Sequence, residues 1–192
     1  GQICLLPKSD GSIGGALIGV EKPSDRPSRE RFALAKAALA LPEGAWKVEN
    51  WPEGVDRAEA AFGWLLAQYA FGRYRKAEGA KARLVAPEGV DAARLLAMAE
   101  AGFLTRDLIN TPANDMGPDA LEAAARDMAA KHGFAVKVVT GEELLDQNFP
   151  LIHAVGRAAA QAPRLIELTR GDAGPQLVLV GKGVCFDTGG LD

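Results

Sequence analysis

Apolar and polar positions alternate along the chain in blocks that predict short strands separated by helices. In the first ninety residues, apolar positions at helical spacing predict one helix over 28–41 and another that begins after Asp56. Asp56 with Glu59 three residues later has the pattern of an N-cap in a variant capping box. Short apolar runs predict strands at 16–20, 44–51 and 82–87. This part of the chain therefore has the pattern of a small α/β unit.

The second half of the chain continues the alternation. A long helix is predicted from Asp91 to about Ile109, because Pro112 prevents its continuation. A second helix is predicted over 117–133, with Pro118 in its first turn and Gly133 as its stop. Further elements follow: a strand at 134–139, a short helix at 142–147, and strands at 164–169 and 176–181. Such alternation predicts an α/β fold with a mainly parallel or mixed sheet, covered on both faces.

The composition narrows the class of protein without identifying it. Of 192 residues, 48% are hydrophobic and 24% are charged, which is typical of a globular protein. The net charge of −3 gives no reason to expect nucleic acid or an anionic membrane as a partner. No apolar run is long enough for a membrane span and no secretory signal is visible. Two cysteines are too few for a disulfide framework, so we expect a cytoplasmic protein.

Few side chains outside the last segment suggest chemistry. His132 is expected at a helix end, where a cation suits the helix dipole. His153 lies among apolar residues and is expected to be a hydrogen-bonded core or interface histidine. Cys185 could be a nucleophile, but no histidine lies near it in the sequence, so a small packing residue is the favoured interpretation. The sequence contains no HExxH, CxxC or G-x-S-x-G pattern.

The segment VGKGVCFDTGG (180–190) concentrates the remaining candidates. Lys182 and Asp187 follow the predicted strand at 176–181, at the edge where ligands collect in open α/β sheets. A carboxylate such as Asp187 suits a divalent cation, and a lysine amine could join it only when deprotonated. The segment is not a phosphate-binding loop, because Gly183 stands where that motif needs a hydroxyl. A salt bridge between Lys182 and Asp187 in a glycine-rich turn remains the alternative.

Three blocks of sequence resemble one family. VGKGVCFDTGG resembles the metal-binding signature of the leucyl aminopeptidases (peptidase family M17), which are cytosolic two-metal exopeptidases. RDLINTPANDMGP (106–118) resembles the segment that opens their catalytic domain, and AVGRAAAQAPRLIEL (154–168) resembles the stretch before the metal-binding strand. The resemblance implies three parts of the chain. They are an N-terminal α/β domain at 1–88, a linker helix at 89–110, and the truncated beginning of an α/β/α metallopeptidase catalytic domain at 111–192.

The resemblance also implies an activity. The family removes N-terminal residues such as leucine from peptides with a free N-terminus, by means of metal-activated water. Lys182 would ligate one of two divalent metal ions, Mn²⁺ or Zn²⁺, and Asp187 would bridge both. The family's catalytic lysine, its other carboxylate ligands and its arginine lie beyond residue 192, so no catalytic residue is expected within this span.

The resemblance and the composition together give further expectations about partners and activity. The chain alone is expected to be inactive, with the missing C-terminal part of the polypeptide as its partner. A homo-oligomer, the family's hexamer, is implied, and neither nucleic acid nor a membrane is expected as a partner. The edge beside the strand at 176–181 is expected to be unpaired unless another polypeptide covers it. The alternative is a non-catalytic α/β module that acts in oligomerisation or ligand binding.

Overall fold

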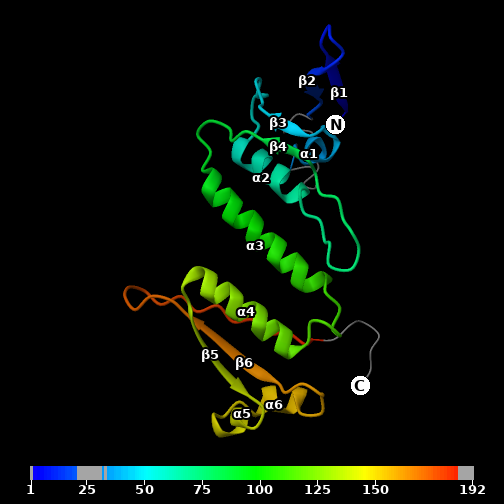
Figure 1. Cartoon of the computed structure of the whole chain (residues 1–192). Helices are drawn as coiled ribbons and strands as arrows, with labels where there is room; N and C mark the ends of the chain where they lie inside the picture. The colour runs from blue at the N-terminus through cyan, green and yellow to red at the C-terminus, as the bar shows by residue number, and fades with distance from the viewer. Residues whose placement is uncertain (1, 21–31, 33, 186–192) are drawn as a thin grey trace. The chain divides into compact units, whose positions relative to one another are not determined.

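The structure is a computed structural model that describes residues 2–20, 32 and 34–185 (Figure 1). The chain divides into two compact units, Gly1–Asp107 and Leu108–Asp192, and each is described by itself. Both units combine helices with small sheets, so the predicted α/β class is confirmed at this level. Within the described residues, no helix combines the length and the apolar character that crossing a membrane requires.

The strands of the first unit form two separate pairs. Strand β1 (Ile3–Pro7) pairs antiparallel with β2 (Ile13–Ile18), with Gly11 at a φ of 80° in the turn between them. Strand β3 (Gly44–Trp46) pairs in parallel with β4 (Ala82–Leu84). The three strands predicted in this region are therefore present, although shorter or shifted. The sequence patterns did not predict β1, whose short apolar run lacks an alternating pattern.

Three helices accompany these strands. They are α1 (Ala35–Ala40), α2 (Arg57–Ala67) and α3 (Ala92–Asn110). The carboxylate of Asp56 accepts hydrogen bonds from the backbone amides of Ala58 and Glu59, at 2.8 and 3.1 Å, so the predicted N-cap is confirmed. Of the helix predicted over 28–41, residues 28–31 and 33 lie outside the described part of the chain.

Small side chains let α1 approach α2 closely in the core of the first unit. Trp64 of α2 is 1% exposed and is the largest fully buried side chain there, surrounded mainly by alanine and leucine. Such close contact excludes water from the apolar surfaces of both helices and stabilises the unit. The remaining buried members of this core are Leu34, Ala37, Ala38, Leu41, Ala60 and Ala82.

The second unit places one long helix against a two-stranded sheet. Helix α4 (Pro118–His132) contacts both strands, and it ends at Gly133, which adopts the left-handed conformation expected of a helix stop (Figure 1). Strand β5 (Ala135–Thr140) pairs antiparallel with β6 (Arg164–Thr169). The short helices α5 (Glu143–Asp146) and α6 (Pro150–Gly156) connect them; α6 was not predicted from the sequence.

The prediction of a strand at 176–181 was wrong. These residues form neither helix nor strand, and the side chains of Leu177 and Val180 are 83% and 91% exposed. The apolar run has the composition of a strand, but a strand also needs a neighbour to hydrogen-bond with. None of the described strands pairs with it. The sheet of this unit is consequently an antiparallel pair rather than a larger parallel or mixed sheet.

Candidate functional site

Lys182 lies on the segment that follows β6. This segment, from residue 170 to residue 185, contains no helix or strand, and the Lys182 side chain is exposed to solvent. Asp187 lies outside the described residues. Neither the predicted metal site nor the alternative Lys182–Asp187 salt bridge is therefore tested by the geometry.

The described residues do not form a metal centre by themselves. Among them, no three His, Cys, Asp or Glu side chains come together in a way that could hold a metal ion. A divalent cation in a protein takes about four to eight ligands, so Lys182 and Asp187 alone could not hold two cations. The donors present in the described part of the chain thus do not fit a complete two-metal site.

Cys185, the last described residue of this segment, is half-buried. Burial raises the pKa of its thiol, and the positive charge of Arg164 acts in the opposite direction with a smaller effect. A thiol with a raised pKa holds little thiolate near neutral pH and is a poor nucleophile. The environment of Cys185 therefore favours the packing interpretation over the nucleophile.

Arg164, at the start of β6, fastens the strand to helix α4. Its side chain is only 10% exposed and forms ion pairs with the carboxylates of Asp119 and Glu122. It also donates to the backbone carbonyl of Ala162. Glu122 pairs in addition with Arg126, and hydrogen bonds from Arg126 and then Arg164 lower the pKa of the Glu122 carboxyl. This cluster holds the start of β6 against α4. Strand β6 lies just before the segment 170–185 that carries Lys182.

Gln161 makes a second connection between the same elements. Its side-chain oxygen accepts a hydrogen bond from the backbone amide of Asp119, in the first turn of α4. A Cβ at Gly117 would collide with the side-chain oxygen of Gln161, so a larger residue there would displace the Gln161 side chain. Two sequence blocks that resemble the leucyl aminopeptidases, 106–118 and 154–168, therefore meet at this point. Reasoning from the sequence missed the roles of Gln161 and Arg164, because their partners lie more than 40 residues away.

Both histidines occupy the expected environments. His132 is the last residue of α4. The Nε2 atom of His153 lies 3.1 Å from a carboxylate oxygen of Glu142, and the histidine side chain is 13% exposed. His153 is thus a largely buried, hydrogen-bonded histidine, as predicted.

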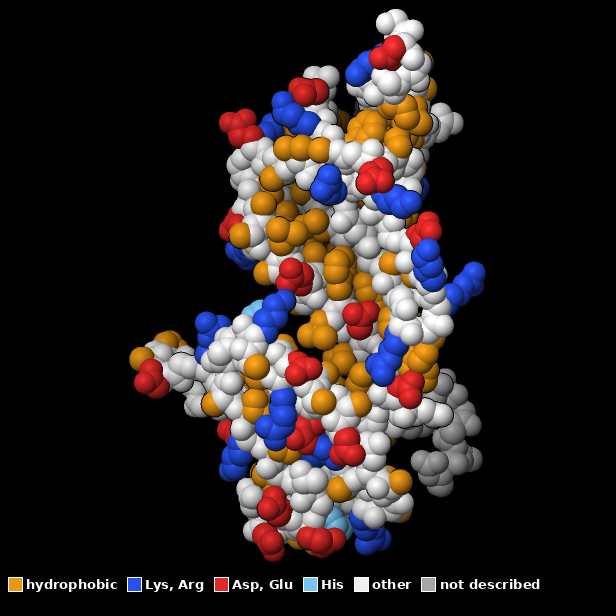
Figure 2. All heavy atoms as spheres, in the orientation of Figure 1, with side chains coloured by type: hydrophobic (Ala, Val, Ile, Leu, Met, Phe, Trp, Pro, Cys, Tyr) orange, Lys and Arg blue, Asp and Glu red, His pale blue; other side chains and the backbone are white. Residues whose placement is uncertain are grey.

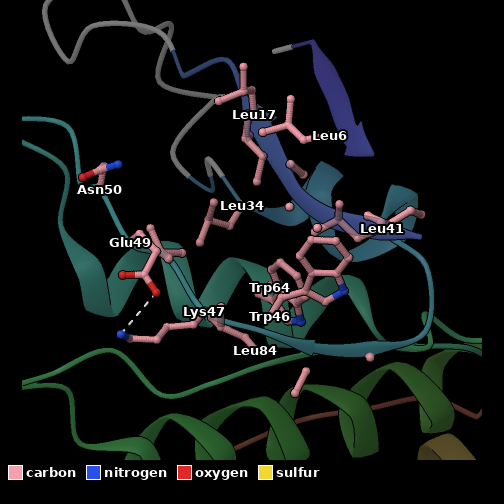
Figure 3. A pocket seen from close by; sticks show the side chains of 18 of the residues that line it. Leu6, Leu17, Leu34, Leu41, Trp46, Lys47, Glu49, Asn50, Trp64 and Leu84 are labelled. Atoms are coloured by element: carbon pink, nitrogen blue, oxygen red, sulfur yellow. Dashed lines mark ion pairs between the residues drawn. The ribbon is translucent and has the colours of Figure 1, made fainter. Parts of the chain in front are cut away.

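A mainly apolar hollow of about 990 Å³ lies in the first unit, between the β1–β2 pair and the segment that follows β3 (Figure 3). The indole nitrogen of Trp64 is buried there without an acceptor among the described residues, whereas that of Trp46 donates to the Pro42 carbonyl. Lys47 and Glu49 form an exposed ion pair beside the hollow. The side chains labelled around it are mostly leucine and tryptophan, so they offer packing surface rather than a catalytic group.

Family models match both halves of the chain. The model described as "M17 aminopeptidase, N-terminal domain" matches residues 1–87, and "Cytosol aminopeptidase family, catalytic domain" matches residues 103–192. A "Probable cytosol aminopeptidase" of Streptomyces coelicolor is 34% identical over an alignment that covers all of this chain and 44% of the relative. The matches therefore support one family along the whole chain.

Solved structures agree with these matches. The crystal structure of a cytosol aminopeptidase from Coxiella burnetii has a TM-score of 0.75 and 35% identity, covering 89% of this chain and 36% of that one. The bottromycin maturation enzyme BotP in complex with Mn has a TM-score of 0.71 and 27% identity, covering 88% and 39%.

The fold and the matched domains define an α/β protein of the aminopeptidase class. The chain belongs to the M17 family of cytosol aminopeptidases and covers its N-terminal domain and part of its catalytic domain. It spans less than half the length of the relatives it matches.

Proposed function

We propose that these residues are part of a two-metal aminopeptidase that removes leucine-like N-terminal residues from peptides. One observation carries the proposal: the match to the family's catalytic domain runs through residue 192 and so includes both Lys182 and Asp187. The match at 1–87 supports the proposed N-terminal domain at 1–88, and helix α3 (Ala92–Asn110) supports the proposed linker helix at 89–110. The first part of an α/β/α catalytic domain is proposed at 111–192, within the catalytic-domain match that begins at residue 103.

In the proposed enzyme, Lys182 would help to hold one divalent cation, and Asp187 would be shared by two. A Mn complex of BotP, a structural relative, supports a divalent cation, and we propose Mn²⁺ or Zn²⁺. Such cations polarise carbonyl groups and activate water near neutral pH. The other donors are proposed to come from polypeptide beyond these 192 residues, since two side chains cannot hold both cations. No catalytic residue is proposed within the span.

The proposed substrate is a peptide with a free N-terminus. The name that the relatives carry, cytosol aminopeptidase, supports a cytoplasmic location. A homo-oligomer, proposed as a hexamer, rests on the family resemblance alone. The rest of the catalytic domain is proposed to pair with the exposed apolar run from Leu177 to Val180, because this would satisfy its backbone and bury its side chains.

The proposal is tested by assaying two samples for release of leucine from a leucyl amide: the 192-residue chain, and the product of the complete reading frame. The chain alone is expected to be inactive, and the complete product to be active with Mn²⁺ or Zn²⁺ and inactive with a chelator. Metal-dependent turnover by the isolated chain would contradict the proposed division of the site. A complete product that is folded and metal-loaded yet inert on every amino-acid amide would favour the non-catalytic module.

A further inference from the structure

A long loop with a positive charge connects α2 to β4. The loop comprises residues 69–81 and contains no helix or strand; we refer to it as the basic loop (Figure 1). Loops of this length without secondary structure are uncommon in compact domains, and those that are ordered are usually functional. The basic loop is not part of the proposed metal site, so the proposed aminopeptidase activity does not explain the function of the loop.

The base of the basic loop is held in place by specific contacts. The side-chain amide of Gln68 donates to the Ala82 carbonyl at 2.9 Å and so joins the two ends of the loop. A side chain on Gly79 would lie 3.2 Å from the Gln68 carbonyl, which shows that the two legs run close together. Tyr69 donates its hydroxyl to Asp107 at 2.8 Å and packs its ring against Phe103 at 5.5 Å. These contacts therefore hold the base of the loop in a defined conformation within the first unit.

The outer part of the loop combines cations with aromatic rings. Residues 72–78 are exposed, and the rings of Phe71 and Tyr74 lie 5.9 Å apart, with the Arg73 guanidinium 5.7 Å from the Tyr74 ring. No described carboxylate forms an ion pair with Arg75, Lys76 or Lys81. Lys and Arg side chains gather on the side of the molecule where the loop projects (Figure 2).

The charge of the loop is opposite to that of the rest of the chain. Four Lys and Arg residues and one Glu give the loop +3 in a chain of net −3, so the remainder carries −6. Within the first unit, the residues outside the loop carry 11 Lys and Arg against 13 Asp and Glu, a net −2. A long polyanion would extend beyond the loop and meet this net negative charge, whereas a short acidic segment would meet only the loop. Two neighbours already contact the Tyr74 ring, which leaves less of it for stacking on a nucleobase.

We propose that the basic loop is a docking surface for an acidic peptide segment of a partner protein. Clusters of arginine and lysine recognise acidic motifs through charge-assisted hydrogen bonds to carboxylates. Phe71 and Tyr74 add an apolar surface beside these cations, which suits a segment that carries one apolar side chain among its acidic residues. This proposal does not depend on the proposed aminopeptidase activity, because no residue of the basic loop lies in the 180–190 segment.

The test measures binding of the 192-residue chain to a fluorescein-labelled peptide in which glutamates flank one leucine. The same peptide with glutamines in place of glutamates, and a labelled single-stranded oligonucleotide, serve as comparison probes. Saturable binding of the acidic peptide is expected, weakened by added salt. The double variant Arg75→Gln/Lys76→Gln should raise the Kd by about fivefold or more, since two exposed charge contacts are removed.

The matched control is Lys8→Gln/Lys36→Gln, which removes two exposed cations of the first unit outside the loop and should leave the Kd within about twofold of the unmodified chain, because neither residue belongs to the docking surface. Circular dichroism of both double variants establishes that they are folded. Three results would overturn the proposal: no saturable binding of the acidic peptide, equal effects of the two double variants, or tighter binding of the oligonucleotide than of the peptide. The last result would identify a nucleic-acid surface instead.

Discussion

At the scale of single residues, Arg164 has the most consequential environment in the second unit. Its guanidinium is largely buried and lies between Asp119 and Glu122, so each carboxylate offsets the cost of keeping the charge away from water. Removing one partner would leave that charge only partly compensated. The Arg164 cluster therefore stabilises the fold when both carboxylates are present, and no single bond in it accounts for the effect.

The lowered pKa of Glu122 gives a pH prediction. A carboxyl whose pKa is lower in the folded than in the unfolded chain stabilises the fold above the unfolded value, 4.5. This contribution is lost as the pH falls below 4.5 and through the folded pKa. The free energy of unfolding in urea, measured from pH 7 down to pH 3, should therefore fall more steeply for the unmodified chain than for Glu122→Gln. The control Glu53→Gln, at an exposed position, should keep the steep profile; equal slopes for all three would contradict this account.

The candidate site shows what could be predicted residue by residue. Physical reasoning on Lys182 and Asp187 left a salt bridge and a metal site open, and only the family resemblance chose between them. The sequence showed that Gly117 belongs to a block that resembles the family. It did not show that Gly117 lies close to Gln161. Such contacts join elements that are distant in the sequence, so the local pattern cannot reveal them.

At the scale of elements, the helices were the most predictable part of the fold. Their starts and stops depend on local signals, such as the Asp56 cap before α2 and Gly133 after α4. Strands β5 and β6 were also predicted where they occur. The exceptions were β1 and α6, which were missed, and the strand at 176–181, which was wrong. A strand depends on a partner elsewhere in the chain, and composition alone does not supply one.

The Asp56 cap can be tested directly. Asp56→Ala removes the acceptor of two backbone amides at the start of α2 and should lower the free energy of unfolding by about 1 kcal/mol. Urea unfolding followed by circular dichroism measures the difference. Glu53→Ala removes an exposed carboxylate three residues earlier, outside the helix, and should change stability by less than about 0.5 kcal/mol. Equal losses for the two variants would show that the cap does not stabilise α2.

Hydrogen exchange tests the conformation of the apolar run from Leu177 to Val180. Amides without sheet hydrogen bonds exchange rapidly, so those of this run should exchange far faster in the isolated chain than those of β5. Mass spectrometry of peptides from both regions compares them in one sample, which makes β5 an internal control. Protection of the run equal to that of β5 would mean that it pairs with another strand, and would contradict the unpaired conformation.

At the scale of the whole molecule, the chain joins two units that match successive domains of one family. The matches are to the N-terminal domain at 1–87 and to the catalytic domain at 103–192. The basic loop belongs to the first unit, and the Lys182 segment to the second. Docking and catalysis, as proposed, would therefore be separable by variants that affect one unit only.

The central claim is that Lys182 is a metal ligand of an aminopeptidase, and one measurement tests it most directly. Leucine release from a leucyl amide is measured in the presence of Mn²⁺ for the complete reading-frame product, its Lys182→Ala variant and its Lys137→Ala variant. Lys182→Ala is expected to lower kcat/KM by about a hundredfold or more, because losing a metal ligand exceeds the cost of losing an outer-shell contact. Lys137→Ala, an exposed lysine on β5, should retain the activity of the unmodified protein. Full Mn²⁺-dependent activity of a folded Lys182→Ala variant would contradict the claim.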